Sequence, residues 1–155
     1  RRRGVHPLDT AARTGGTGGG RGAAVINPPA LVEPRGYAPA VEVTGPGRWL
    51  VLAGQTALDP QGRITAPGDL VGQFDRVLGN ITTVLAAAGM APDDVVRMRI
   101  YVTDVRAYKE KGPELGRVWR AHFGRHYPAM TLVEVSRLYD DGAVVEVEAE
   151  AFKAS

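Results

Sequence analysis

The strongest constraint on the fold is a strict alternation near the end of the chain, in the stretch VVEVEAEAF at residues 144–152. Glutamate occupies every second position, as Glu146, Glu148 and Glu150, and small or branched apolar residues lie between them. Because neighbouring side chains of a β-strand point to opposite faces of a sheet, this pattern predicts a strand with one apolar and one acidic face. A sheet that contains it must bury one face and leave the other to solvent or to a partner.

Two stretches with helical spacing predict how the apolar face is covered. In residues 70–88 apolar side chains recur every third or fourth position, after a capping residue at Asp69 and before a stop at Gly89. Residues 113–123 form a second amphipathic stretch, which begins with a proline and is followed by a glycine. Two helices are therefore expected to pack on one face of the sheet.

Short β-rich runs predict the remaining strands. Residues 38–43 and 48–56 flank a turn cluster at 44–47, so they are expected to form a hairpin, and residues 130–136 form a further strand. The run at 95–102 alternates, with Arg97, Arg99 and Tyr101 on one face and Val96, Met98, Ile100 and Val102 on the other. The order of elements predicts an α+β domain. Its polar sheet face fits an oligomer interface better than open solvent.

The first 22 residues differ in composition from the rest of the chain. They hold five arginines against one aspartate, and seven glycines, whereas the remainder holds 14 basic and 16 acidic side chains. A segment with so little to bury cannot offset the entropy of ordering it. We expect residues 1–24 to be a disordered basic tail and residues 25–155 to be a single domain. The sequence pI of about 9.2 then reflects the tail and is no sign of a nucleic-acid-binding fold.

Several classes of chemistry lack support in the residues. The chain has no cysteine, and its three histidines, His6, His122 and His126, show no metal-ligand spacing, so no metal is expected. No apolar run approaches the roughly 20 residues of a membrane span, which predicts a soluble, cytoplasmic protein with no membrane partner. The carboxylates remain. A half-buried glutamate can have a raised pKa and move a proton, although a solvated strand face explains the same pattern.

Motifs along the chain resemble one known family. They run in the order GYAPAVEV, LVLAGQTALDPQG, QFDRVLGNITTVLAAAGMAPDDVVRMRIYVTDV, YPAMTLVEVSRL and VVEVEAEAF. From about Ala30 to Phe152 the chain is similar to the Rid/YjgF (RidA-like) reactive intermediate deaminases. The resemblance implies a chorismate-mutase-like fold with a mixed sheet, and a homotrimer with clefts between subunits. It also implies hydrolysis of enamines and imines such as 2-aminoacrylate, without metal or organic cofactor.

The resemblance also implies site residues, and three of them depart from the family pattern. Tyr37 and Glu146 fall where the family has a cleft tyrosine and the glutamate that positions water, and Gln55 falls in the Gly-Gln pair. The arginine that grips the substrate carboxylate is replaced by Met130, which offers neither charge nor donor. Ala53 stands where a serine is frequent, and Leu132 where a small or thiol residue is frequent.

These departures leave two main interpretations and a weaker third. In the first, the chain is an enzyme for a neutral or more hydrophobic enamine, imine or related intermediate of a specialised biosynthetic pathway, with Glu146 as acid and base. In the second, catalysis is lost and the trimer binds a small apolar molecule or a protein. The third is the ribonuclease activity associated with some family members, which would need a cationic surface that this mildly acidic domain does not offer.

Overall fold

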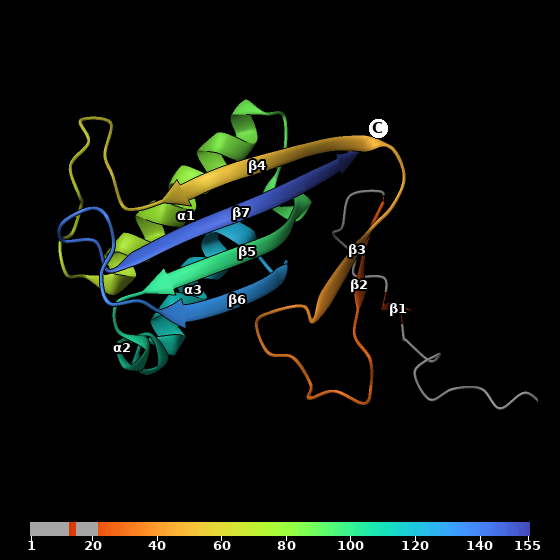
Figure 1. The fold of residues 1–155 in the computed structure, drawn as a ribbon, viewed down its shortest axis with the longest axis horizontal. Helices are drawn as coiled ribbons and strands as arrows, with labels where there is room; N and C mark the ends of the chain where they lie inside the picture. The colour runs from red at the N-terminus through yellow and green to blue at the C-terminus, as the bar shows by residue number, and fades with distance from the viewer. Residues whose placement is uncertain (1–12, 15–21) are drawn as a thin grey trace, which may run out of the picture.

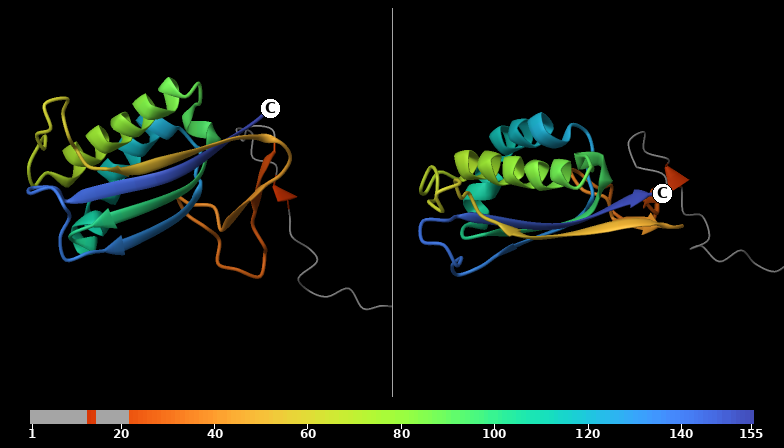
Figure 2. Two further views of the ribbon diagram at one scale, coloured as in Figure 1. Left: turned by 45° about the horizontal axis from the view of Figure 1, so that its top comes forward. Right: turned by 90° about the horizontal axis from the view of Figure 1, so that it is seen from above.

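The main body of the molecule is a four-stranded sheet with its helices on one face (Figure 1; Figure 2, right). The computed structural model describes residues 13–14 and 22–155. Its sheet has the order β4-β7-β5-β6, formed by Gly47–Gln55, Val145–Ala154, Val95–Val102 and Ala129–Glu134. Strands β5 and β6 are parallel and the other pairs are antiparallel, so the sheet is mixed. The predicted α+β class, with helices on one face, is confirmed.

Both predicted helices form near the expected bounds. Helix α1 spans Leu70–Ala87, and the Asp69 side chain accepts a hydrogen bond from the backbone N–H of Gly72 at 3.1 Å. Helix α3 spans Gly112–Phe123 with a proline at its start. A six-residue helix α2, Val105–Glu110, was not predicted, because one and a half turns are too short to show a periodic apolar stripe.

The core lies between the sheet and helices α1 and α3. Buried side chains come from α1, from alternate positions of β5 and β7, and from α3; the fully buried ones include Phe74, Leu78, Ile81, Leu85, Met98, Val102, Val145 and Val147. The predicted alternation of β5 fails at one place. A register shift between Val95 and Arg97 inserts one extra residue, so Val95 faces the core and Val96 does not belong to that cluster.

The predicted hairpin between residues 38–43 and 48–56 is wrong. Strand β3, Ala40–Val43, pairs with β2, Ala23–Ile26, in a separate three-stranded sheet, and it makes no ladder with β4 in the described chain. The turn between them is present, but the backbone N–H of Thr44 donates to the carbonyl of Gly22 at 2.6 Å. Strand β3 therefore pairs with the N-terminal strand β2, whereas a hairpin would have paired it with β4. The run Ala23–Ile26 was too short to predict as a strand.

The expected tail at 1–24 needs a correction at its end. Ala23 and Ala24 belong to β2, and Arg13–Thr14 forms strand β1 beside it. Backbone pairing offsets the ordering entropy that the composition alone could not offset. Residues 1–12 and 15–21 lie outside the described residues, so their disorder and the tail-domain division stay predictions. No helix in the described chain is long and apolar enough to cross a membrane.

The buried amide of Gln73 joins α1 to the loop before β7. It has 0% of its surface exposed, and its nitrogen donates to the carbonyls of Ala66 at 3.1 Å and Gly142 at 2.8 Å. Its oxygen accepts from the backbone N–H of Val144 at 2.9 Å. Three backbone groups of two loops therefore depend on one side chain.

We expect Gln73→Leu to lower the free energy of unfolding by about 2–4 kcal/mol, because it leaves those backbone groups unpaired at a buried site. Urea unfolding followed by circular dichroism measures this change. Gln61→Leu, on an exposed turn, is the matched control and should change stability by less than about 0.5 kcal/mol. Equal stability of the two variants would contradict this role for Gln73.

Candidate functional site

The open face of the sheet carries a charged network across its two central strands. Arg99 lies opposite Glu148, and its guanidinium contacts Glu148 at 3.3 Å and Glu150 at 3.1 Å. The Tyr101 hydroxyl donates to Glu148 at 2.6 Å, and this hydrogen bond raises the pKa of Tyr101. Two of the three alternating glutamates therefore serve to hold the face of the sheet together.

Glu146 differs from Glu148 and Glu150 on the same strand. It lies opposite Tyr101 in the β5–β7 ladder, and it makes no hydrogen bond or ion pair with any described residue. Burial raises the pKa of its carboxyl, and repulsion by Asp140 and Glu148 raises it further. A carboxylate with this combination of burial and like charge is a better proton acceptor than an exposed one.

A bulge in β4 makes room for the Glu146 carboxylate. The register between β4 and β7 shifts between Leu52 and Gln55, so β4 holds one residue more than its partner there. Gly54 lies in the bulge, and a Cβ built on it would come within 2.6 Å of Glu146 Oε1. The absence of a side chain at 54 therefore allows the carboxylate to lie against the backbone.

Asp140 is held near this carboxylate by a short hydrogen bond. The buried Thr56 hydroxyl donates to Asp140 Oδ2 at 2.6 Å. Asp140 precedes the Gly142–Val144 segment that Gln73 fixes. Asp140 and Thr56 were not among the sequence-predicted site residues, because a loop aspartate 84 positions away along the chain shows no spacing pattern with a threonine.

The six predicted site residues fall into two groups in the described chain. Glu146, Ala53 and Gln55 lie on β7 and at the β4 bulge. Tyr37, Met130 and Leu132 lie at the edge strand β6: Ala38, next to Tyr37, donates its N–H to the carbonyl of Pro128 at 2.9 Å and bridges to Ala129. Strand β5 separates β6 from β7.

Glu146 also lies on the opposite face of the sheet from Met130 and Leu132. Met130 and Leu132 pack against the helix-side core, beside Met98 and Ile100 of β5. Glu146 lies on the open face with Tyr101. One copy of the chain therefore does not bring Glu146 together with Met130 and Leu132.

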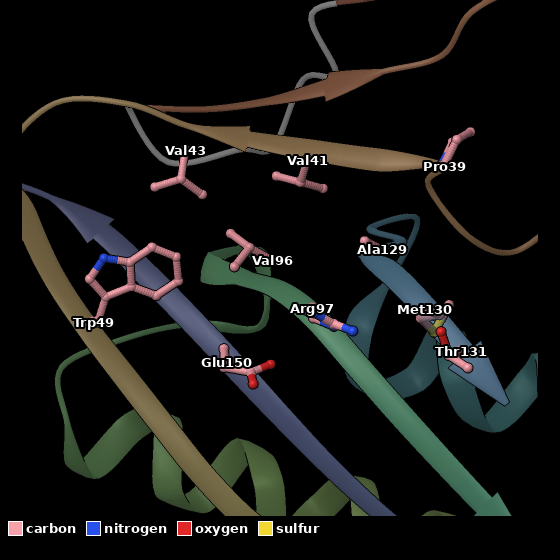
Figure 3. Close-up of a pocket in the computed structure, with 10 residues that line it drawn as sticks. All are labelled: Pro39, Val41, Val43, Trp49, Val96, Arg97, Ala129, Met130, Thr131 and Glu150. Carbon is pink, nitrogen blue, oxygen red and sulfur yellow. The ribbon is translucent and has the colours of Figure 1, made fainter. Parts of the chain in front are cut away.

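A hollow of about 500 Å³ lies over the open face near β3 (Figure 3). Val41 and Val43 of β3 face it from one side, and Trp49, Arg97 and Glu150 line it from the sheet. The second carboxylate oxygen of Glu150 is buried there without a hydrogen-bond partner among the described residues. Sequence reasoning missed this hollow because the hollow forms only when β3 pairs with β2 in the separate sheet and not with β4.

The two histidines of the described chain have structural partners. His122 lies 2.6 Å from Asp75 and so connects α3 to α1, and His126 lies 2.7 Å from the carbonyl of Val95. Within residues 13–14 and 22–155, no group of three histidines or acidic residues has the geometry of a metal site.

The mixed sheet with its helices on one face places this chain among the small α+β proteins. The chain belongs to the Rid/YjgF family, whose model, described as endoribonuclease L-PSP, matches residues 30–153. The fold is the chorismate-mutase-like fold that the sequence resemblance implied.

Individual relatives agree with this assignment. A RutC family protein of Pyrococcus horikoshii is 34% identical over 120 residues, which cover 77% of this chain and 91% of that protein. The 2-iminobutanoate/2-iminopropanoate deaminase of Escherichia coli is 29% identical over 134 residues, with 84% and 95% covered. The crystal structure of a Rid family protein from Yersinia pestis matches with a TM-score of 0.75 at 32% identity, covering 84% of this chain and 98% of that one.

We expect Gly54→Ala to lower the pKa of Glu146 towards its ordinary value. The added methyl group occupies the place of the carboxylate, which then moves outward into solvent, where burial no longer raises its pKa. A carboxyl-carbon NMR titration measures the shift.

Gly79→Ala is the control, since a Cβ at residue 79 meets no atom closer than 3.6 Å. It should leave the pKa of Glu146 unchanged, while an alanine inside α1 favours the helix. The close approach of Glu146 to Gly54 would be refuted by an unchanged titration in Gly54→Ala.

Proposed function

We propose that this chain is a homotrimeric hydrolase of an enamine or imine, with Glu146 as the acid and base that activates water. The observation that carries the proposal is the state of Glu146, which has a raised pKa and no partner among the described residues, while Glu148 and Glu150 are bound by Arg99. The name of the Escherichia coli relative, an iminobutanoate and iminopropanoate deaminase, supports the same reaction class.

The chemistry needs one group that moves a proton in both directions. An enamine first tautomerises to its imine. Glu146 then takes a proton from water as the oxygen adds to the carbon of the C=N bond, and it returns the proton to the nitrogen. Glu146 then carries the hydroxyl proton of the tetrahedral intermediate to the nitrogen, so that the C–N bond breaks, ammonia leaves and a ketone remains. A carboxyl with a raised pKa is suited to both steps, because its two protonation states are closer in free energy near neutral pH.

Trimer formation supplies what a single copy does not bring together. Glu146 and Met130 lie on opposite faces of one sheet, so a cleft that contains both types of group has to form between copies. The open face also leaves Val51 76% exposed and Trp49 56% exposed, which is apolar area that association can bury. The family resemblance supplies the number of three.

Met130 favours a substrate without a carboxylate. The guanidinium of the family pattern would hold a carboxylate through two charge-assisted hydrogen bonds, and a thioether makes neither. Arg99, a cation on the open face of the sheet, is engaged by two glutamates. We therefore propose a neutral, more hydrophobic imine from a specialised biosynthetic pathway.

A non-catalytic binding protein is the second candidate, and one observation favours it. The three departures at Ala53, Met130 and Leu132 all replace polar groups of the family pattern with apolar ones. The same apolar surface could hold a ligand without reaction. Ribonuclease action has weaker support, because residues 23–155 carry a net charge of −2.

We expect Glu146→Gln to reduce imine hydrolysis by roughly 10²–10⁴-fold while the fold stays intact, because the amide keeps the shape of the side chain but accepts no proton from water. The imine of acetophenone, generated in situ by an amine oxidase from 1-phenylethylamine, is a neutral test substrate, and ammonia release above the spontaneous rate is the readout. Glu150→Gln, on the same strand and face, should retain most of the rate. Full activity in Glu146→Gln would eliminate the assigned role, and no activity in the native protein on any neutral imine would favour the binding protein.

The pH profile gives a second readout of the same group. Because the pKa of Glu146 is raised, the rate should fall on the acid side at a pH above that of an ordinary glutamate. Asp140→Asn removes one of the repelling charges, which lowers the pKa and moves this acid limb to lower pH. An acid limb that does not move would show that another group titrates.

The native protein should have the mass of three chains in solution by light scattering. Val51→Glu places a charge on the exposed apolar part of β4 and should reduce that mass, because burying an unpaired charge opposes association. Gln61→Glu, on an exposed turn, should leave the mass unchanged. A native mass of one or two chains would contradict the trimer.

A further inference from the structure

A second, smaller hollow of about 190 Å³ lies on the helix side of the sheet, at the edge where Met130 lies. Its walls come from α1, α2, α3, the loops before β3 and β6, and strands β5 and β6; they include Phe74, Tyr108, Leu115, Trp119, Tyr127 and Met130. We call this hollow the aromatic pocket. No charged side chain lines it.

The walls of the aromatic pocket are flat and mutually packed. Trp119 and Tyr127 are stacked, with ring centroids 5.8 Å apart and an angle of 8° between their planes. Phe74 and Tyr108 meet edge to face at 6.2 Å and 88°. Trp119 is also anchored by its indole N–H, which donates to the carbonyl of His126 at 3.1 Å. Such fixed aromatic surfaces favour a planar or alkyl group by contact.

Two glycines of α3 help to leave the space open. Gly112 and Gly116 both line the aromatic pocket, one turn apart. Neither has the positive φ that would require glycine, and a Cβ on Gly112 would meet no atom within 4 Å. Glycine inside a helix costs about 1 kcal/mol relative to alanine, so the backbone of Gly116 gains nothing from it. An added Cβ on Gly116 would lie 3.2 Å from Arg120 Nη1, so at this position glycine leaves room for the Arg120 side chain beside the pocket.

Tyr108 adds one polar group to this apolar lining. The side chain is half-buried, and burial raises the pKa of its hydroxyl, which therefore stays protonated at neutral pH. The hydroxyl has no hydrogen-bond partner among the described residues. It is free to donate one hydrogen bond to a neutral acceptor such as a carbonyl oxygen or an imine nitrogen.

We propose that the aromatic pocket holds a ring-sized apolar group of the substrate, which makes the substrate class an aryl or similarly bulky neutral imine. An engineered protein cavity of about 150 Å³ lined by apolar side chains takes up benzene, so a hollow of this size suits one ring. A carboxylate is disfavoured, because no lining residue carries a positive charge and one hydroxyl does not offset the cost of removing its charge from water.

The pocket also has a position from which it can serve the reaction. Met130 lines both the aromatic pocket and the larger hollow on the open face. A ligand whose ring lies in the aromatic pocket therefore extends past Met130 at the edge of the sheet. This inference rests on the proposed function for what happens there, since the Glu146 that reacts would come from a neighbouring copy.

The test measures binding, separately from turnover. Acetophenone, the ketone that an aryl methyl imine would leave, is titrated into the full-length protein by calorimetry, and benzoate serves as the anionic ring of similar size. We expect acetophenone to bind at least about tenfold more tightly than benzoate, a difference of about 1.4 kcal/mol. Gly116→Leu places a bulky side chain at a position that lines the pocket, where an added Cβ would lie 3.2 Å from Arg120 Nη1, and it should weaken acetophenone binding by about tenfold or more.

Two controls define the site. Ala121→Leu adds the same side chain at an exposed position of α3 outside the pocket and should bind acetophenone as the native protein does. Met130→Arg should reverse the preference in favour of benzoate, because it supplies a bidentate partner for a carboxylate. Thermal unfolding checks that each variant is folded.

A crystal soaked with 4-bromoacetophenone locates the ligand even if Gly116→Leu fails to fold. Anomalous bromine density between Trp119 and Met130 supports the proposal. Density elsewhere, no binding, or benzoate bound as tightly as acetophenone would overturn it.

Glu146→Gln separates the two proposals. If the variant still binds acetophenone and keeps its turnover, the proposed function alone is refuted. If the variant loses turnover and neither it nor the native protein binds acetophenone, the pocket alone is refuted.

Discussion

Strand β7 determines most of this structure, because it is paired on both sides at the centre of the sheet. Its register with β4 and β5 decides which face every one of its residues takes. A slip by one position would move Glu146, Glu148 and Glu150 into the helix-side core, where three unpaired charges could not be accommodated. The alternation in the sequence therefore fixes the orientation of the whole sheet towards α1 and α3.

The charges on the open face follow from that register. Arg99 lies opposite Glu148 and reaches Glu150, so one cation stabilises two of the three carboxylates. Glu146 lies at the end of the row, opposite an uncharged tyrosine and close to Asp140. The same arrangement that makes two glutamates structural leaves the third in the state that suits proton transfer.

Local sequence patterns predicted the parts of the fold that depend on interactions between residues close together in the chain. Helix α1 begins after Asp69 because of a cap that is visible in the sequence, and β5 and β7 show their alternation directly. The hairpin failed because the choice of partner for β3 depends on residues 23–26, far from the turn. Val96 was placed on the wrong face because a bulge leaves no mark in a pattern of period two.

The candidate site also has a part that the sequence predicted and a part that it did not. The position of Glu146 follows from the strand pattern and the family motif, but its neighbour Asp140 comes from a loop whose place is set by Thr56 and Gln73. The aromatic pocket combines seven separate segments, including the unpredicted α2. A site of that kind depends on tertiary packing, and no spacing in the sequence announces it.

The bulge divides β4 into two segments, and the alternation of side chains between the two faces of the sheet is shifted by one residue from one segment to the other. Residues before it, such as Trp49, and residues after it, such as Gln55, keep their faces only because one extra position lies between Leu52 and Gln55. Substitution at Ala53 would change a side chain, whereas deletion of one residue there would regularise the ladder and rotate one segment to the other side of the sheet. Over evolutionary time Ala53 is therefore open to substitution, whereas the number of residues in the bulge is not open to change.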